Sequence, residues 1–286
     1  MNFVLQKFYE KYNNNKKINQ DAYVDDLAIA ECVKVGTIPK MQEILDDMYL
    51  WTSELKMKLN PKKCIVLLID FTKKQESRNV KLTINNEELP VKNETKLLGV
   101  QMNSKGNWDT HIPYIVTNAS KRIFMLRRLK YFGFTKDDLI LIYISYIRPL
   151  LEYSSQLWSS SITQSQIKSI ISVEKRCLGI ILGKFVNSSN YDKILSDFNC
   201  TSIRDRMEKL FLEFGISLFK SIKFNPWISS HLIESTRSRR CTDIFRTIQF
   251  KTERYGNCSI PQIIRALNTC DPKLLGINEE ESTEQT

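Results

Sequence analysis

The sequence predicts an α+β protein, in which a small antiparallel sheet with one packed helix is followed by an all-α helical bundle. Short apolar runs alternate with turn clusters as far as residue 105. From residue 107 to about residue 223, apolar residues instead recur at three- and four-residue steps, as they do along amphipathic helices. A basic stretch follows, and the acidic residues 279–284 read as a disordered tail. We therefore expect three segments, residues 1–105, 106–224 and 225–286.

The first segment is expected to run strand, helix, strand, strand, strand. The helix covers about residues 39–59 and holds Trp51, which we expect in the core. The apolar stretches with strand character are AYVDDLAIA, CIVLLIDF, VKLTINNEELP and KLLGVQMN. In the third of these, Asn85 and Asn86 predict a hairpin turn, because asparagine tolerates the positive φ that a two-residue turn requires.

The second segment is expected to form four helices, which begin near residues 107, 136, 164 and 202. Pro149 should divide the second helix near Arg148, because its ring nitrogen donates no backbone hydrogen bond. The third helix should end at Gly183, since glycine readily adopts the left-handed conformation that terminates helices. Four aromatic residues recur at helical spacing and are expected in the core: Tyr143, Tyr146, Tyr153 and Trp158.

The composition limits the functional classes. The 286 residues are 42% hydrophobic and 26% charged, as in folded globular proteins. No apolar run approaches the roughly 20 residues of a membrane span, and the amino end does not resemble a secretory signal, so we expect an intracellular protein. The seven cysteines lie at least 12 residues apart and only two histidines are present, which argues against a zinc site. The net charge of +10 favours a polyanionic partner, with nucleic acid as the leading candidate.

The sequence Tyr23-Val24-Asp25-Asp26 places two adjacent carboxylates between apolar, strand-prone residues. At the tip of a hairpin, such carboxylates can bind Mg²⁺ through their oxygen atoms. Two ions about 3.5–4 Å apart can activate an attacking hydroxyl and stabilise a leaving phosphate. The motif is short, and a solvated acidic turn gives the same pattern.

A series of longer segments runs along the chain: YVDDLAIAE, WTSELKMKLNPKKC, KLLGVQMNSKGNWDTHI, KRIFMLRRLK, IRPLLEYSSQLW, VEKRCLGIILG and RTIQFKTERYGNCSIPQIIRALN. In order and spacing they resemble the reverse transcriptases of non-LTR (LINE-like) retrotransposons, with palm motif C first and motif D second. The resemblance covers about residues 22–268. It implies the carboxyl-terminal half of an RNA-directed DNA polymerase, a nucleotidyltransferase: part of the palm, a helical thumb and a C-terminal tail.

The resemblance also implies roles for individual residues. Asp25 matches the motif C carboxylate that binds catalytic Mg²⁺, and Asp26 matches its supporting neighbour. Tyr23 matches the position beneath the incoming nucleotide or primer end, although a buried strand tyrosine fits the sequence equally well. Lys63 matches the motif D lysine, which neutralises charge near the triphosphate or protonates the leaving pyrophosphate; an ordinary solvated lysine is the alternative. Leu98-Gly99 matches the turn that grips the primer, with a plain hairpin glycine as the alternative.

The thumb-like region is basic. Residues 107–184 contain 11 Lys and Arg against five Asp and Glu. The resemblance implies that this bundle follows the backbone of an RNA template paired with a DNA primer, by charge and shape. The candidate backbone-binding residues are Lys121, Arg122, Arg127, Arg128 and Lys130. For each of them, a solvated helix face is the alternative.

One element of the family pattern is not found in the sequence. A palm polymerase also needs the motif A aspartate from a preceding strand, but only 22 residues precede Tyr23. Their acids are Glu10 and Asp21, and neither lies in a strand-like apolar run with the separation from motif C that the family pattern needs. We therefore expect upstream fingers, palm and endonuclease segments to complete the protein. By itself, the chain is expected to supply only part of the two-metal Mg²⁺ site and to extend no primer.

Two other interpretations stay open. A noncatalytic nucleic-acid-binding remnant would keep the thumb and lack a complete metal site. The helices around WDTHIPYIVTNASKRIFMLRRLKYFG also look similar to the amino-terminal module of AlkB-homologue tRNA-modifying enzymes. An iron-dependent oxygenase, however, needs two histidines and a carboxylate as ligands, and this chain has no HxD motif.

Overall fold

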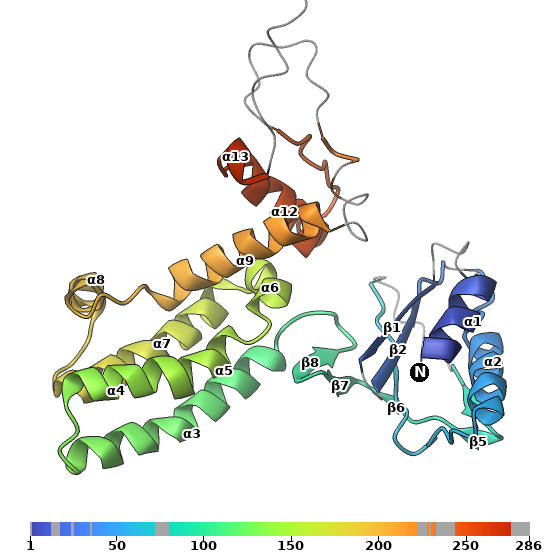
Figure 1. The fold of residues 1–286 in the computed structure, drawn as a ribbon, viewed down its shortest axis with the longest axis horizontal. Helices are drawn as coiled ribbons and strands as arrows, with labels where there is room; N and C mark the ends of the chain where they lie inside the picture. Colours follow the sequence, from blue (N-terminus) through green and yellow to red (C-terminus); the bar gives the residue numbers. More distant parts are fainter. Residues whose placement is uncertain are drawn as a thin grey trace, which may run out of the picture. The chain divides into compact units, whose positions relative to one another are not determined.

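The computed structural model describes residues 2–12, 18–23, 26–34, 36–71, 80–221, 228, 230–232 and 244–275. Its architecture is α+β, as the sequence predicts (Figure 1). The chain divides into two compact units. The first comprises Met1–Thr95 and Asn103–Gly106, and the second comprises Lys96–Met102 and Asn107–Thr286. The expected acidic tail lies outside the described residues.

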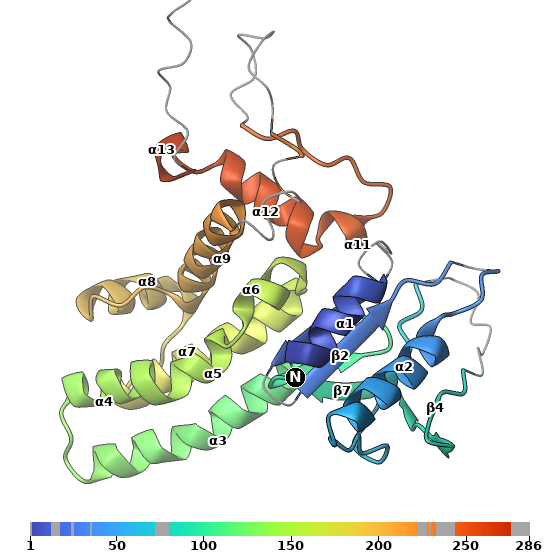
Figure 2. The ribbon, with the colours of Figure 1, turned by 45° about the vertical axis from the view of Figure 1, so that its right-hand side comes forward.

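A hairpin covered by helices forms part of the first unit. Strand β1 (Ile18–Tyr23) pairs antiparallel with β2 (Asp26–Glu31). Helices α1 (Asn2–Tyr12) and α2 (Met41–Glu54) pack against this hairpin (Figures 1 and 2). Their shared core consists of Val4, Phe8, Tyr12, Ile18, Ile44 and Met48. Trp51 is partly buried beside this core, so its expected packing role is confirmed.

Helix α1 is not among the elements predicted from the sequence. Its buried residues Val4, Phe8 and Tyr12 follow one another at four-residue intervals, which places them on one face of a helix. Lys7 and Lys11 stand between them and interrupt the apolar run. Lys11 and Tyr12 both bond to the Asp47 carboxylate of α2, which fastens the two helices together.

The expectation of one small antiparallel sheet is wrong. The described strands form separate two-stranded ladders, and β3 (Val66–Leu67) pairs parallel with β6 (Val91–Lys92). In the sequence between β3 and β6, β4 (Thr83–Ile84) and β5 (Glu87–Glu88) form an antiparallel hairpin. A parallel pair needs a connection that crosses back, and strands of two residues carry too little alternation to reveal their pairing direction.

The asparagine turn between β4 and β5 is confirmed. Asn85 and Asn86 have φ values of 50° and 62°, the two positive values of a tight hairpin turn. The hairpin buries Leu82, Ile84 and Leu89 in a second small core, against which side chains of α2 pack. Gln42 of α2 reinforces this contact, because its side chain accepts from the Thr83 amide and donates to the Thr83 carbonyl oxygen.

The second unit is a helical bundle preceded by a hairpin of β7 (Glu94–Leu97) and β8 (Val100–Asn103), which connects it to the first unit along the chain. Its long helices are α3 (His111–Tyr131), α7 (Gln164–Leu182) and α9 (Ile203–Lys220). The shorter ones are α4 (Lys136–Ile142), the π-helix η1 (Tyr143–Ile147), α5 (Arg148–Glu152), α6 (Ser155–Trp158), the 3₁₀-helix η2 (Ser159–Ser161) and α8 (Ser188–Asp197). The four expected helical stretches are confirmed, and α8 is additional.

The expected division near Arg148 takes a specific form. The backbone widens into the π-helix η1 directly before Arg148, and Pro149 then occupies the first turn of α5. Pro149 has no amide hydrogen, and its ring crowds the carbonyl group four residues earlier, that of Ser145. The wider π turn accommodates this ring while the chain continues as a helix.

Local sequence signals set the ends of the long helices. Gly183 has a φ of 72° and ends α7, as expected; its amide donates to the Gly179 carbonyl oxygen at 2.9 Å. At the start of α7, the Thr163 side chain accepts from the Gln166 amide, and Gln166 bonds back to the Thr163 amide. Ser202 caps α9 in a similar way by accepting from the Asp205 amide.

The C-terminal segment packs on α9 and belongs to the second unit. It contains α11 (Glu253–Gly256), α12 (Ser259–Asn268) and α13 (Pro272–Leu275), and Figure 2 shows α12 lying across the carboxyl end of α9. Gly215 of α9 allows this close approach, because a Cβ atom there would lie 3.0 Å from the Ile263 side chain. The helices of the described segments are all too short or too polar to cross a membrane.

Candidate functional site

The motif C match lies at the end of the β1–β2 ladder. Tyr23 and Asp26 form its last pair, and both are exposed, Tyr23 by 65%. The alternative of a buried strand tyrosine is therefore wrong. Ile18 and Gln20 form the buried face of β1, and Tyr23 lies on the opposite face because successive strand residues point to opposite sides. Val24 and Asp25, the two residues between this pair, lie outside the described residues.

A further carboxylate shares this exposed face. Asp21 belongs to β1 and pairs with Ala28, two residues before Tyr23 in the same strand. Directly paired residues point to the same side of an antiparallel ladder, which puts Asp21, Tyr23 and Asp26 on one face. Exposed carboxylates suit the oxygen preference of Mg²⁺. Within the described segments, no three His, Cys, Asp or Glu side chains form a group that could hold a metal ion.

Lys63 lies in the turn between α2 and β3. Its amide donates to the Asn60 carbonyl oxygen at 3.0 Å, and its side chain is exposed. No hydrogen bond or ion pair of the described residues joins it to Tyr23 or Asp26. The role that the resemblance implies for Lys63 stays a prediction.

The Leu98-Gly99 turn is attached to the helical bundle. Leu98 and Gly99 have φ values of 44° and 89°, and the Tyr153 hydroxyl donates to the Leu98 carbonyl oxygen at 2.6 Å. A Cβ atom on Gly99 would lie 3.0 Å from a ring carbon of Tyr153. Glycine at this position therefore allows both the left-handed backbone and the close approach of the Tyr153 ring.

His111 supports the same hairpin from the start of α3. Its Nδ1 accepts from the Gln101 amide of β8 at 3.2 Å, and its ring packs between Trp108 and Trp158, with centroids 5.9 and 5.8 Å away. The side chain is fully buried, and its Nε2 has no hydrogen-bond partner in the part of the chain that the structure describes. Burial lowers the pKa of this imidazole, because the charged form loses its solvation.

The five predicted backbone-binding residues of α3 make different contacts within the chain. Lys130 donates to the carbonyl oxygens of Ile180 and Ile181, so it caps the end of α7 instead of facing a ligand. Arg122 donates to the Tyr146 carbonyl oxygen at 2.6 Å, and its guanidinium lies 4.2 Å from the centroid of that tyrosine ring. These two side chains therefore already make contacts within the bundle, and their expected nucleic-acid role stays a prediction.

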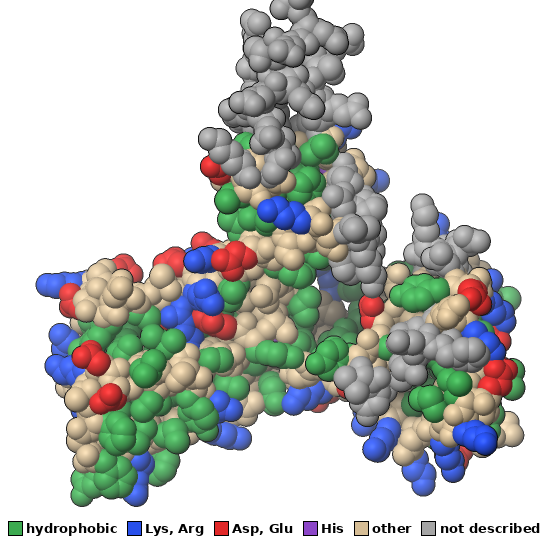
Figure 3. Space-filling view, viewed as in Figure 1, with side chains coloured by type: hydrophobic (Ala, Val, Ile, Leu, Met, Phe, Trp, Pro, Cys, Tyr) green, Lys and Arg blue, Asp and Glu red, His purple; other side chains and the backbone are tan. Residues whose placement is uncertain are grey.

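The other three residues, Lys121, Arg127 and Arg128, are exposed. Arg128 lies near the rings of Phe124 and Phe132, at 5.9 and 5.4 Å from their centroids. Lys121 and Arg128 are seven residues apart and share one face of α3. Exposed apolar side chains gather at the end of the unit where α3 leads into α4 (Figure 3): Phe124, Met125, Tyr131, Phe132, Phe134 and Leu141. This face of α3 therefore combines cations with aromatic rings.

The expected core aromatics separate into two pairs. Tyr143 and Trp158 are fully buried, as predicted, whereas Tyr146 and Tyr153 are 41% and 51% exposed. The prediction is wrong for this second pair, because the π-helix and the turn after α5 rotate those side chains out of the helical repeat.

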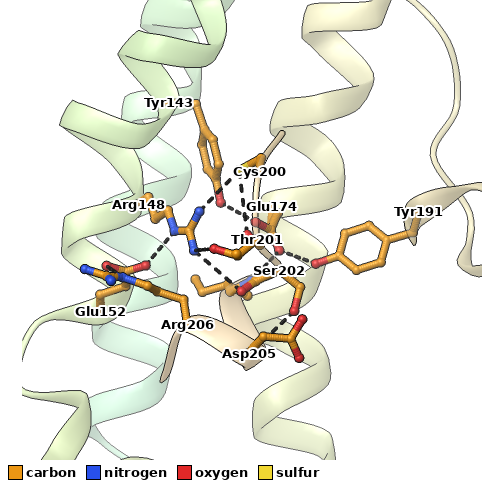
Figure 4. A network of polar contacts seen from close by, with 11 residues as sticks. Tyr143, Arg148, Glu152, Glu174, Tyr191, Cys200, Thr201, Ser202, Asp205 and Arg206 are labelled. Atoms are coloured by element: carbon orange, nitrogen blue, oxygen red, sulfur yellow. Dashed lines mark hydrogen bonds and ion pairs between the residues drawn. The ribbon is translucent and has the colours of Figure 1, made fainter. Parts of the chain in front are cut away.

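Sequence reasoning missed a buried carboxylate in the bundle. Glu174 of α7 is fully buried and accepts from the Tyr143 hydroxyl at 2.8 Å, from the Tyr191 hydroxyl and from the Ile203 amide at 3.1 Å (Figure 4). Burial, and then the nearby Glu174 carboxylate, raise the pKa of both tyrosines. The sequence could have indicated this burial, because Glu174 occupies a position on the apolar face of α7, next to Val173 and Cys177.

Arg148 lies beside this carboxylate in Figure 4. It is 5% exposed, forms an ion pair with Glu152, and donates to Cys200 Sγ at 3.3 Å and to Thr201 Oγ1 at 3.4 Å. Arg206 of α9 reaches Glu152 as well, at 3.7 Å. Together these contacts fix the chain segment that leads into α9.

Comparisons of the chain with protein-family models, with curated proteins and with solved structures find no match.

Proposed function

We propose that this chain is the carboxyl-terminal part of a reverse transcriptase of the non-LTR type, and that its helical unit holds a template–primer duplex. The order of the matching segments along the chain carries this proposal. It is supported by the β7–β8 turn, which the Tyr153 hydroxyl and His111 hold against the bundle. A turn that grips a primer end must keep its position relative to the helices that hold the duplex.

The proposed palm contribution is Asp25 with Asp26. Asp26 lies exposed at the end of a two-stranded ladder, with Asp21 on the same face, and these oxygen donors fit a hard divalent cation. When bound, Mg²⁺ would supply charge stabilisation for phosphoryl transfer. We propose that the motif A aspartate comes from a segment other than the described strands.

The proposed thumb contribution is the exposed face of α3. Lys121, Arg127 and Arg128 present cations without ion-pair partners among the described residues, and duplex backbones are bound mainly through such charges. Lys130 and Arg122 support the bundle instead, through the contacts described above. The proposal thus assigns backbone binding to three of the five candidates.

Binding and polymerisation can be tested separately. The 286-residue chain should bind an RNA–DNA heteroduplex at 50 mM salt and lose affinity steeply by 200 mM salt; binding that is absent at low salt would contradict the proposal. Fused in frame behind the fingers and palm segment of a non-LTR reverse transcriptase, the chain should support RNA-templated primer extension. Asp25→Ala in that fusion should abolish extension and leave heteroduplex binding intact.

A noncatalytic nucleic-acid-binding remnant is the second candidate. It is favoured by the β1–β2 ladder, whose two strands pair with each other and with no third strand of the described segments. A two-metal site needs carboxylates on both sides of the ion pair. A fusion that binds heteroduplex but extends no primer would favour this candidate over the polymerase.

A further inference from the structure

A cleft with basic walls opens between three helices of the second unit, away from the α3 residues discussed above. Its volume is about 410 Å³, and its lining residues are Gln164, Lys168, Ile171, Ser172, Lys175, Ser188 and Arg204. Three of the seven are cations, three more carry uncharged polar groups, and none is acidic. Among the described residues, neither lysine nor the arginine has an ion-pair partner.

Defined contacts hold one of the three cations, Lys175, at the cleft, and the helices place the other two. Lys175 Nζ donates to Ser188 Oγ at 3.1 Å and lies 5.0 Å from the centroid of the Tyr191 ring. Lys168 precedes Lys175 by seven residues on α7, so both are on the same face of that helix. Arg204 projects from the first turn of α9.

The buried Glu174 explains why these three helices keep their spacing. Its carboxylate accepts from Tyr191 of α8 and from the Ile203 amide of α9, while it is itself part of α7. Ile203 directly precedes Arg204, and Tyr191 lies beneath Lys175. One buried group therefore ties together the three elements that carry the cleft's cations.

We propose that this cleft is a second binding site for nucleic acid, and that it takes phosphate groups of the polynucleotide backbone. Lysine, arginine and hydroxyl donors facing one volume without carboxylates are the groups that bind phosphate. The lining offers no aromatic ring on which a base would stack, so the cleft recognises backbone and not sequence. This inference rests on the proposed nucleic-acid function and extends it beyond α3.

The test compares charge reversals at the two surfaces. The cleft variant carries Lys168→Glu and Arg204→Glu, the α3 variant carries Lys121→Glu and Arg128→Glu, and Lys209→Glu is a control on an exposed lysine of α9. A labelled single-stranded oligonucleotide is titrated at several salt concentrations. The cleft variant should bind about tenfold more weakly than the control and lower the slope of log K against log salt by about two.

A second measurement identifies the ligand group. Inorganic phosphate titrated into the ¹⁵N-labelled protein should shift the amide resonances of Ser188 and Arg204, in the wild type and in the α3 variant but not in the cleft variant. Oligonucleotide binding by the cleft variant that equals that of the control would overturn the proposal, whatever the α3 variant does. Phosphate shifts at Ser188 and Arg204 without any oligonucleotide binding would also overturn the polynucleotide assignment. Loss of heteroduplex binding in the α3 variant bears on the proposed function alone.

Discussion

The Tyr153 hydroxyl donates a 2.6 Å hydrogen bond to the Leu98 carbonyl oxygen, across 55 residues of sequence. Leu98 has a positive φ, and Tyr153 directly follows the short helix α5. Because Gly99 leaves room for the tyrosine ring, the turn lies directly against the bundle. The primer-grip match thus coincides with a point at which the β7–β8 hairpin is fixed to the helices.

Tyr153→Phe removes this hydrogen bond and keeps the ring. We expect the free energy of unfolding in urea to fall by about 1 kcal/mol, the usual net contribution of one such bond. The amide of Gly99 should also exchange its hydrogen faster. Tyr146→Phe is the matched control, since no hydrogen bond of its hydroxyl occurs among the described residues. Equal effects of the two substitutions would contradict the anchoring role.

Lys130→Met tests whether this lysine caps α7. The substitution removes the cation that donates to the Ile180 carbonyl oxygen and keeps most of the apolar stem, so we expect a loss of about 1 kcal/mol in stability. The salt dependence of heteroduplex binding should stay that of the wild type. A slope reduced by one with unchanged stability would show that Lys130 instead contacts phosphate.

Lys121→Glu combined with Arg128→Glu tests the exposed face of α3. Both side chains are exposed, so thermal unfolding should change little, whereas heteroduplex affinity should fall and the slope of log K against log salt should decrease by about two. Anisotropy titrations between 50 and 200 mM salt measure this slope. Lys209→Glu, which changes charge elsewhere on the unit, should bind as the wild type does.

Features that depend on local chemistry could be predicted from the sequence. Three such features follow from the conformational limits of one or two residues each. They are the turn at Asn85 and Asn86, the end of α7 at Gly183 and the break in the α-helix before Pro149. The recurrence of apolar residues at three- and four-residue steps likewise predicted the long helices. These signals need no knowledge of the rest of the chain.

Features that depend on tertiary contacts could not be predicted in the same way. Lys130 has the sequence context of a solvated lysine, and only the position of α7 shows that it caps a helix. The parallel pairing of β3 with β6 depends on the path of the chain between them. The position of Glu174 on an apolar helix face could be seen in the sequence. Its partners could not, because they come from η1, α8 and α9.

His111 predicts a loss of stability in weak acid. An unfolded histidine titrates near pH 6.5, and burial lowers the pKa of His111 in the folded protein, so below about pH 6.5 the unfolded chain binds the proton more readily. The stabilisation is complete above that pH and is lost as the pH falls toward the folded pKa, by at most about 1.4 kcal/mol per pH unit. Urea unfolding of wild type and His111→Gln at pH 7.5 and 5.5 measures the difference. If the wild type loses no more unfolding free energy between pH 7.5 and 5.5 than His111→Gln does, the buried imidazole is not the cause of the acid sensitivity.

Glu174→Gln should destabilise the bundle more than the substitutions of exposed lysines and arginines. The carboxylate accepts from two hydroxyls and one amide in a fully buried site, and an amide side chain would turn a donor toward one of those donors. We expect the free energy of unfolding to fall by about 3 kcal/mol, as for other broken buried networks. Urea unfolding measures it, with the exposed Glu213→Gln as the control.

A double-mutant cycle with Tyr191→Phe shows whether the effect belongs to the network. Once Glu174 is replaced, removing the Tyr191 hydroxyl should cost less than it does in the wild type, because its acceptor has already been lost. Additive losses would mean that the two groups act independently. In that case Glu174 would not be the residue that holds α8 and α9 to α7.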